Sequence, residues 1–255
     1  MTQNIKYWFL FLPNGELILN DNYTIYKGVN PTTETPNHIF QLPEIDNIEC
    51  VATEINQIPQ NMISINLRAS YDKIDWKFYY LAGKASELIY FNNQYQFCPK
   101  CGHKMEFSSD ISKKCVECGN EIWPPISPAI ICLISKGKDE ILMTHGINFK
   151  GNFHGLVSGF LETGESLEEC LEREVLEETG IKVKNIKYFK SQPWPYPSGL
   201  MVGFFAEYNG GEIKMQESEL SDCRWFNRYN MPETPRKLSM ARMLIDYWLE
   251  NPEKF

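Results

Sequence analysis

Short apolar runs, separated by polar and proline-containing segments, mark the first 95 residues of the chain. The runs IKYWFLFL, MISINLRA and WKFYYLA are rich in β-branched and aromatic residues and predict strands. The run LAGKASELIY, residues 81–90, has the pattern of a short helix. This part of the chain therefore predicts a small α+β domain, and we see no catalytic motif in it.

From Ala129 onward the pattern becomes one of alternating strands and loops. The runs AIICLIS and EILMTH predict a hairpin that turns around residues 136–139. An amphipathic helix is expected at about residues 238–249. Further strands are expected at LVSGF, IKVKNIKYFK and MVGFFAEY.

The segment GFLETGESLEECLEREVLEETGI, residues 159–181, carries eight glutamates and one arginine in 23 residues. Ser166 and Glu169 have the spacing of a capping box, so we expect a helix that begins at Leu167. Gly180 is a typical helix stop. The segment is therefore predicted to be a loop followed by a short acidic helix.

The apolar and acidic positions of this helix coincide. At about 100° per residue, Leu167, Leu171 and Val175 share one stripe, and Glu174 and Glu178 project in nearly the same direction. A merely solvated helix would turn its carboxylates away from its leucines. Carboxylates gathered on a half-buried face repel one another unless a cation neutralises them, so this face predicts a Mg²⁺ or Mn²⁺ site.

Four of the eight cysteines form the pattern C-x2-C-x13-C-x2-C, at Cys98, Cys101, Cys115 and Cys118. Two such pairs, each followed by glycine, are typical of a zinc ribbon whose four thiolates close the coordination sphere, so the Zn²⁺ is expected to be structural. His103 lies beside the first pair and is expected not to bind. Two disulfides or free thiols are the alternative, and disulfides are disfavoured because nothing marks the chain as secreted. The remaining cysteines are expected to be small core residues: Cys50, Cys132, Cys170 and Cys223.

The composition of the chain excludes some classes of protein but indicates no specific reaction. A hydrophobic fraction of 43% and a charged fraction of 23% are those of a soluble globular protein. The net charge of −8 argues against a broad nucleic-acid-binding surface, although it leaves room for a local basic pocket. The apolar run near the N-terminus is too short for a membrane span and lacks a signal-peptide cleavage site. We therefore expect a cytoplasmic protein with no membrane association.

The acidic segment resembles the Nudix box position for position, with the matching residues Gly159, Glu165, Arg173, Glu174, Val175, Glu177, Glu178, Gly180 and Ile181. This resemblance to the Nudix hydrolase family implies an α/β/α sandwich and metal-assisted hydrolysis of a nucleoside diphosphate linked to another moiety. The expected fold is thus α+β, with a Nudix sandwich at residues 125–255. A small N-terminal α+β domain at 1–95 and a zinc ribbon at 96–124 are expected to precede it.

The segment SQPWPYPSG, residues 191–199, resembles the SQPWPFPxS array of the NADH pyrophosphatase (NAD-capped RNA hydrolase) branch of this family. Tyr196 replaces the usual Phe, and Gly199 stands where a second Ser is usual. The three prolines predict an extended backbone that presents flat rings to a nucleotide. The resemblance implies hydrolysis of the pyrophosphate of NADH or NAD⁺ to a nicotinamide mononucleotide and AMP, and removal of NAD caps from RNA 5′ ends.

The resemblance also implies roles for the acidic residues. Glu174 and Glu178 would bind the catalytic metal, and Glu177 would be a third ligand or a base. Glu219, which lies downstream of the box, would complete the metal site or act as base.

The loop that precedes the acidic helix is expected to support this site. Arg173 would fix the position of the acidic face by forming an ion pair with a loop carboxylate. Glu165 and Arg173 lie on either side of the start of the helix. Gly159 and Gly164 would let the loop curl against the metal site.

Substrate contacts follow from the same resemblance. Phe160 and Trp123 would stack on the adenine from different subunits of a homodimer. The alternative for either ring is a place in the core. Further contacts are expected from the array and from the last helix: Gln192, Trp194, Tyr196, Ser198, Ser239 and Ala241.

Two other functions remain open at this point. The first is Nudix chemistry on another substrate, such as ADP-ribose or a diadenosine polyphosphate. The second is a non-catalytic nucleotide sensor or RNA-binding protein that uses the zinc ribbon. The intact acidic box argues against the second, as do the few ribbon lysines, which nearby carboxylates offset.

Overall fold

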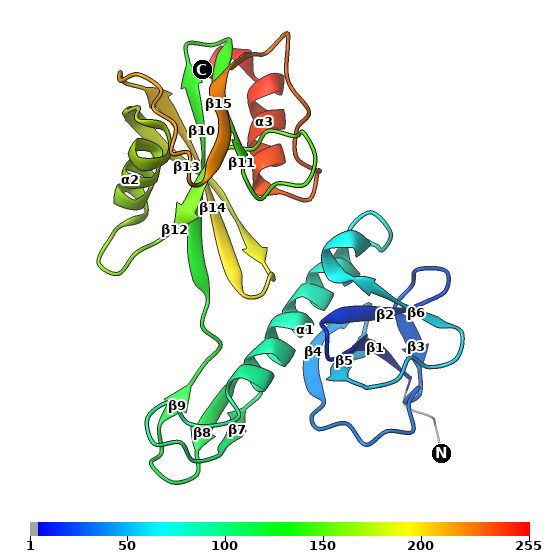
Figure 1. Ribbon diagram of the computed structural model, residues 1–255. Coiled ribbons are helices and arrows are strands. Elements are labelled where there is room, and N and C mark those ends of the chain that lie inside the picture. Colours follow the sequence, from blue (N-terminus) through cyan, green and yellow to red (C-terminus); the bar gives the residue numbers. More distant parts are fainter. Residues whose placement is uncertain (1–4) are drawn as a thin grey trace. The chain divides into compact units, whose positions relative to one another are not determined.

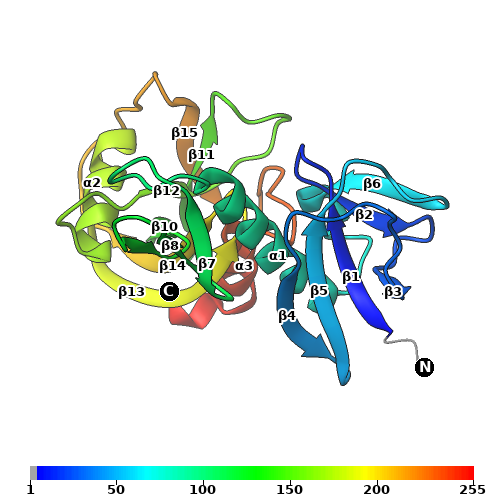
Figure 2. The ribbon, with the colours of Figure 1, turned by 90° about the horizontal axis from the view of Figure 1, so that it is seen from below.

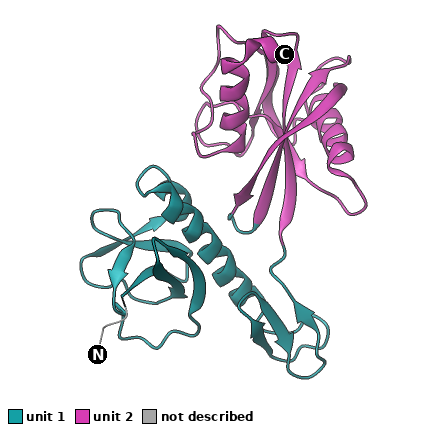
Figure 3. Ribbon diagram, turned by 180° about the vertical axis from the view of Figure 1, so that it is seen from behind, with its two compact units in different colours: residues 1–125, 195–198 teal, residues 126–194, 199–255 magenta. Residues whose placement is uncertain are grey.

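The computed structural model describes residues 5–255, which divide into two compact units. Unit 1 contains the chain up to Pro125 together with Pro195–Ser198, and unit 2 contains Ile126–Trp194 and Gly199–Phe255 (Figure 3). Among the described residues, no helix has both the length and the apolar character that a membrane span requires.

Unit 1 begins with a six-stranded sheet in which β1 pairs with β5 in parallel and the other pairs are antiparallel (Figure 2). The strand order is β4-β5-β1-β2-β6, with β3 paired to β1. Phe9, Leu10 and Leu19 are fully buried in it. The strands are β1 (Lys6–Phe11), β2 (Glu16–Asn20), β3 (Tyr26–Gly28), β4 (Phe40–Ile45), β5 (Ile48–Glu54) and β6 (Met62–Asn66), followed by the 3₁₀ turn Leu67–Ser70.

One sequence prediction in this unit is wrong. The run WKFYYLA forms about the first two turns of helix α1 (Trp76–Gln94) rather than a strand. Its aromatic residues favour a strand, but the Asp75 side chain accepts a hydrogen bond from the Lys77 amide at 3.0 Å and caps a helix there. The predicted helix at 81–90 is present and extends beyond both expected ends.

The cysteine-rich segment follows α1 within the same unit. It forms a three-stranded sheet of β7 (Met105–Ser109), β8 (Ser112–Cys115) and β9 (Glu121–Ile122). The Lys113 side chain is 2% exposed and donates to the carbonyl oxygens of Asn92 and Tyr95, each at 3.0 Å. These carbonyls lie at the C-terminal end of α1, where a helix leaves acceptors unpaired, so Lys113 ties the ribbon to the helix.

Unit 2 is built on a mixed sheet in the order β13-β14-β10-β11-β15, with β12 paired to β10. The predicted hairpin is present, because β10 and β11 pair antiparallel. The strands are β10 (Ser127–Lys136), β11 (Glu140–Gly146), β12 (Val157–Phe160), β13 (Val183–Trp194), β14 (Gly199–Tyr208) and β15 (Leu220–Asn227).

Helices α2 (Leu167–Thr179) and α3 (Met240–Glu250) cover opposite faces of this sheet (Figure 1). The central strand β10 is buried on both sides: Ile130 packs in the α2 core, and its neighbour Ile131 packs in the α3 core. This alternation is that of a strand inside a sandwich, and the predicted α/β/α arrangement is confirmed. The short 3₁₀ turn Pro252–Lys254 follows α3.

The proline-rich array forms the end of a hairpin. Ser191 to Trp194 extend β13, as predicted, and Gly199 opposite Trp194 begins β14. Residues 195–198 form a turn instead of continuing the extended backbone. The reason is topological, because β13 and β14 are antiparallel neighbours and the chain must reverse between them.

Candidate active site and zinc site

The acidic helix α2 begins and ends where the sequence predicts. Ser166 is its N-cap, and both hydrogen bonds of the capping box with Glu169 are present. Gly180 has a φ of 74° and closes the helix. Leu171 and Val175 are fully buried, and each such burial stabilises the fold by about 1.5–3 kcal/mol. The apolar stripe therefore holds the helix on the sheet with its acidic residues at a defined depth.

Glu178 and Glu174 lie on this buried face. Glu178 is only 6% exposed, and the Glu174 side chain is 14% exposed. Burial, reinforced by the charges of Glu174 and Glu219, raises the pKa of Glu178 to about 8. Burial also raises the pKa of Glu174, against the opposing effect of Arg173. The face thus holds one carboxyl group, that of Glu178, whose negative charge is opposed by burial and by its acidic neighbours.

Gly159 in β12 makes room for Glu174. A Cβ atom at this position would lie 1.9 Å from the carboxyl carbon of Glu174, which is far inside any allowed contact. The expectation that Gly159 curls the loop is therefore replaced by a different role, a close approach between a strand and a carboxylate. Gly164, with a φ of 96°, is the glycine that turns the loop.

Arg173 joins the loop to the acidic face. Its guanidinium donates to Glu165 at 2.5 and 3.0 Å, to Glu174 at 2.9 Å and to Glu177 at 3.2 Å. It also donates to the Phe160 carbonyl at 3.1 Å. The hydrogen bonds from Arg173 lower the pKa of Glu165 to about 2. Arg173 therefore orients Glu174, and no cationic side chain among residues 5–255 forms an ion pair with Glu178.

Glu219 is held near the end of α2 by a residue that sequence reasoning did not single out. The backbone amide of Gln216 donates to the Glu178 carbonyl at 3.0 Å, and the Gln216 side chain donates to Glu219 at 3.1 Å. Glu219 lies in the turn before β15 and is exposed. The Glu177 side chain is 55% exposed, so it lies at the edge of the face.

These carboxylates suit a hard divalent cation, which takes oxygen ligands and keeps some of its waters. Within residues 5–255, however, only the four ribbon cysteines bring three or more ligand atoms within 4.8 Å of one another. The carboxylates of Glu174 and Glu219 are thus close enough to raise the pKa of Glu178, but the three groups do not form a closed cluster. Mutual repulsion accounts for this spacing.

The two aromatic residues expected to stack on adenine are both exposed. Phe160, at the end of β12, is 65% exposed, and Trp123, after β9, is 56% exposed. The alternative that places either ring in a core is therefore wrong. An exposed large aromatic ring is available for stacking on a flat ligand.

Gln192 and the start of α3 come together. Gln192 is 4% exposed and donates through Nε2 to the Leu238 carbonyl at 2.7 Å, while its buried Oε1 has no partner in the described chain. Ser239 is the N-cap of α3, and its side chain accepts from the Arg242 amide. Ala241 is buried in the first turn of this helix. The array and the last helix are therefore joined by a hydrogen bond.

The turn of the array packs within unit 1. The Tyr196 hydroxyl hydrogen-bonds the Tyr79 hydroxyl of α1, and the Arg68 guanidinium lies 5.9 Å from the centre of the Tyr196 ring. Ser198 donates to the Pro125 carbonyl at 2.7 Å. The departure from Phe to Tyr at position 196 thus supplies a hydrogen bond that Phe lacks, and nothing local in the sequence indicates Tyr79 as its partner.

The cysteine sulfurs gather at one point, as the sequence predicts. All four lie within 4.8 Å of one another, with Sγ separations such as 3.7 Å between Cys98 and Cys118 and 3.4 Å between Cys101 and Cys115. Tetrahedral zinc with Zn–S bonds of about 2.3 Å spaces its sulfurs about 3.8 Å apart, whereas a disulfide bond is about 2.05 Å. The glycines that follow the two pairs, Gly102 and Gly119, have φ values of 77° and 69° and turn the backbone there. The residues therefore fit a zinc ion.

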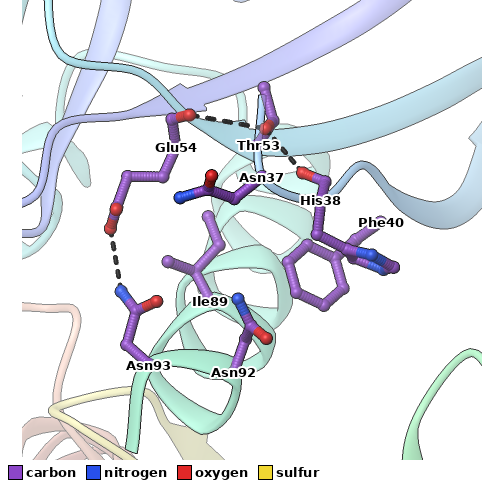
Figure 4. A pocket seen from close by; sticks show the side chains of 8 residues that line it. All are labelled: Asn37, His38, Phe40, Thr53, Glu54, Ile89, Asn92 and Asn93. Carbon is purple, nitrogen blue, oxygen red and sulfur yellow. Dashed lines mark hydrogen bonds between the residues drawn. The ribbon is translucent and has the colours of Figure 1, made fainter. Parts of the chain in front are cut away.

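A small hollow in unit 1 contains none of the predicted site residues (Figure 4). Several of its polar groups already bond to one another: Asn93 donates to Glu54 at 2.9 Å, and Thr53 donates to the His38 carbonyl at 2.7 Å. We assign it no function. Its lining is Asn37, His38, Phe40, Thr53, Glu54, Ile89, Asn92 and Asn93.

An α/β/α sandwich in which a glycine of the sheet makes room for a carboxylate of the acidic helix defines the class of protein. The family model of the NUDIX domain matches residues 125–247, and the chain belongs to this family. It is similar to proteins named NAD-capped RNA hydrolase NudC. The relative from Haemophilus influenzae is 40% identical over 176 residues, which cover 68% of this chain and 67% of that protein.

Two further relatives carry the same name. The protein from Mannheimia succiniciproducens is 45% identical over 179 residues, which cover 67% of each chain. The protein from Pseudomonas fluorescens is 41% identical over 184 residues, which cover 72% of this chain and 66% of that protein. The similarity extends beyond the NUDIX domain itself, which spans only residues 125–247.

Proposed function

We propose that this protein hydrolyses the pyrophosphate of NADH or NAD⁺ to a nicotinamide mononucleotide and AMP, and that it removes NAD caps from RNA 5′ ends. The observation that carries the proposal is the buried, uncompensated Glu178 beside Glu174 and Glu219. The substrate is inferred from the names of the relatives and from the array at residues 191–199.

Glu174, Glu178 and Glu219 would hold Mg²⁺ or Mn²⁺, with Glu177 as a further ligand or the base. A bound divalent metal lowers the pKa of the attacking water and neutralises charge on the phosphate oxygens. In the balanced reaction, water adds its oxygen to one phosphorus, the P–O–P bond breaks, and the bridging oxygen stays on the other phosphate. The protein's own task is to hold the carboxylates in place, and Arg173 orients Glu174 for it.

The exposed rings of Phe160 and Trp123 support a stacking role toward the adenine. We propose that two chains form a homodimer in which one subunit supplies each ring. Gln192, Trp194, Tyr196, Ser198, Ser239 and Ala241 complete the proposed substrate contacts. One structural Zn²⁺ per chain is proposed at the four cysteines, and a reduced thiol site of this kind supports a cytoplasmic location.

Product analysis by chromatography tests this proposal. The protein would be incubated with NADH, NAD⁺, ADP-ribose or NAD-capped RNA in Mg²⁺ or Mn²⁺, beside a Glu178→Gln variant. We expect AMP and reduced nicotinamide mononucleotide from NADH, with no product from the variant. Faster turnover of ADP-ribose would reassign the substrate. A folded, zinc-loaded protein that cleaves nothing would leave the nucleotide-sensor function in place of the enzyme.

A further inference from the structure

The edge strand β13 carries four exposed lysines: Lys182 just before it, then Lys184, Lys187 and Lys190. None of them makes an ion pair or a side-chain hydrogen bond with any residue between 5 and 255. In a chain with a net charge of −8, four neighbouring lysines that form no ion pair are a local reversal of charge. We call this set the lysine row.

The register of the sheet places the whole row on one face. Lys184, Lys187 and Lys190 lie opposite residues 207, 205 and 203 of β14, and the hydrogen bonds between Lys182 and its neighbours Asn209 and Gly210 continue the ladder. Directly opposed residues of an antiparallel pair share a face, and alternate residues of β14 share a face as well. The four lysines therefore point to the same side, the one on which Phe205 packs in the α3 core.

Two bulges produce this alignment. Lysines three residues apart would lie on opposite faces of a regular strand. The register shifts by one residue between Lys184 and Lys187, where Asn185 has a φ of 52°, and again between Tyr188 and Lys190. Each shift returns the next lysine to the shared face. Because of the two bulges, the row lies opposite residues 203–209 of β14, and at about 3.3 Å per residue it spans roughly 20 Å.

The row continues toward Gln192, a proposed substrate contact on the α3 side of the sheet, whereas Glu174 and Glu178 lie on α2 on the other side. Gln192 follows Lys190 in the same strand, lies opposite residue 201, and so shares the face of the row. Its side chain bonds the Leu238 carbonyl next to Ser239. Glu207 lies opposite Lys184, and its carboxylate accepts a hydrogen bond from Asn185 at 2.9 Å. Tyr188 is 62% exposed but lies on the other face.

We propose that the lysine row binds the phosphate backbone of the RNA that follows an NAD cap. The inference rests on the proposed function of the site. A free dinucleotide has only the two phosphates whose linkage is cleaved, and it cannot use a charged row roughly 20 Å long. A capped RNA carries one more phosphate per nucleotide, which lysines neutralise with release of counterions. The row thereby favours capped RNA over free NADH without reading its sequence.

Charged residues also protect exposed sheet edges from pairing with other chains. That role needs charges on the edge but does not require every lysine to lie on one face; the bulges also let Ile186 pack in the α2 core and Phe189 in the α3 core. The two roles differ in what they predict, because edge protection affects solubility alone, whereas backbone binding changes the salt dependence of RNA cleavage.

The test uses the full-length protein with Lys182, Lys184 and Lys187 all changed to Gln. We expect kcat/KM for NADH to stay within about twofold of the wild type, since no residue of the acidic face changes. For a 20-nucleotide single-stranded NAD-capped RNA, we expect kcat/KM to fall about tenfold or more at moderate salt. The slope of log kcat/KM against log salt should lessen by about 2, since each phosphate that a lysine no longer neutralises accounts for about 0.7 of it.

A matched control changes Lys100, Lys104 and Lys114 of the zinc ribbon to Gln, which removes the same charge from exposed positions. It should leave both substrates unaffected. If the β13 variant cleaved capped RNA like the wild type with the same salt slope, or if only the ribbon variant cleaved RNA more slowly, the row would have no RNA role. If the glutamine variant precipitates, a Lys→Glu version keeps the edge charged and should cleave RNA still more slowly.

Failure of the proposed function has a different signature. A wild-type protein that does not hydrolyse NADH would overturn the enzyme, and the row would then be tested by binding alone. The probe is the same RNA with a 5′-monophosphate, titrated at several salt concentrations. Weaker binding with a smaller salt slope in the β13 variant supports the row, and identical titrations overturn it.

Discussion

The two candidate metal sites of this chain differ in how far the protein alone assembles them. The four cysteine sulfurs already lie within 4.8 Å of one another. The carboxylates of α2 and Glu219 are close enough to raise the pKa of Glu178, yet they do not gather in the same way. The protein alone brings the four cysteine ligands together, which we call the closed site, whereas the carboxylate ligands stay apart, which we call the open site.

The difference follows from the chemistry of the ligands. Thiols can share protons and hydrogen bonds before a metal binds, and two tight turns at Gly102 and Gly119 set their positions. Carboxylates on a buried face repel, and Arg173 neutralises only those on one side of the face. A closed site suits a structural ion. An open site leaves room for the waters and phosphate oxygens that a catalytic ion needs.

The largest expected effect comes from removing the buried carboxylate. Glu178→Gln should lower NADH turnover by about a thousandfold or more, which corresponds to several kcal/mol of transition-state stabilisation. The fold should be retained, because Gln has the size of Glu and removes the repulsion from Glu174 and Glu219. Steady-state kinetics and thermal unfolding measure the two effects. Glu172→Gln, an exposed glutamate of the same helix, is the control and should have little effect.

The closed site should show the reverse behaviour, with a large effect on folding. Cys118→Ser or removal of zinc by a chelator should destabilise unit 1 by several kcal/mol, since zinc binding is coupled to folding in small ribbons. Thermal unfolding and the zinc content per chain provide the measurements, with Cys223→Ala as the control outside the cluster. Unchanged stability after complete zinc loss would contradict a structural role.

Gly159→Ala separates positioning from folding at the open site. The three atoms nearest to the added Cβ would all belong to the carboxyl group of Glu174, the far end of a flexible side chain, so the fold should tolerate it. Glu174 must move aside, and a displacement of about 1 Å at a reacting centre can cost about a hundredfold. We therefore expect a loss of kcat/KM of about ten- to hundredfold with a nearly unchanged Tm. Ser158→Ala on the same strand is the control. Equal losses of kcat/KM in both variants would show that the space beside Gly159 does not position Glu174.

Glu87 tests whether burial alone raises the pKa of a carboxylate, and it should give the smallest effect. It lies on α1, where burial raises its pKa to about 7 against the opposing charge of Lys84. The folded-state pKa exceeds the unfolded value of about 4.3, so Glu87 contributes its full stability below that value. This contribution is lost as the pH rises through the folded pKa of about 7.

Glu87→Gln should therefore match the wild type near pH 4 and exceed its stability by on the order of 1–3 kcal/mol at pH 8. Denaturant unfolding at several pH values, with and without Mg²⁺, is the measurement. The difference between the proteins should not respond to the metal, since Glu87 belongs to neither site. A gap that is the same at every pH would show that Glu87 is not desolvated.

Local signals explain what could be predicted. The start and end of α2 depend on neighbours within a few residues, at Ser166, Glu169 and Gly180, and all three act as expected. The cysteine spacing likewise implies two turns that bring four sulfurs together. The run WKFYYLA, in contrast, has the residue types of a strand, and its helical form depends on the cap at Asp75, a local signal that the strand prediction overlooked, together with the rest of α1.

The sequence by itself therefore determined the family, the acidic face, the zinc ligands and the order of elements in unit 2, because each depends on short-range spacing. Only the tertiary structure decided that the Gln216 side chain donates to Glu219 and that the Glu174 carboxyl group occupies the space that a Cβ atom on Gly159 would fill. It also decided that two bulges place the lysines of β13 on one face. These features depend on register and on contacts between distant segments. The alternation of faces that is counted along a strand fails at the first bulge. It also does not reveal which residue of the neighbouring strand will lie opposite a given position.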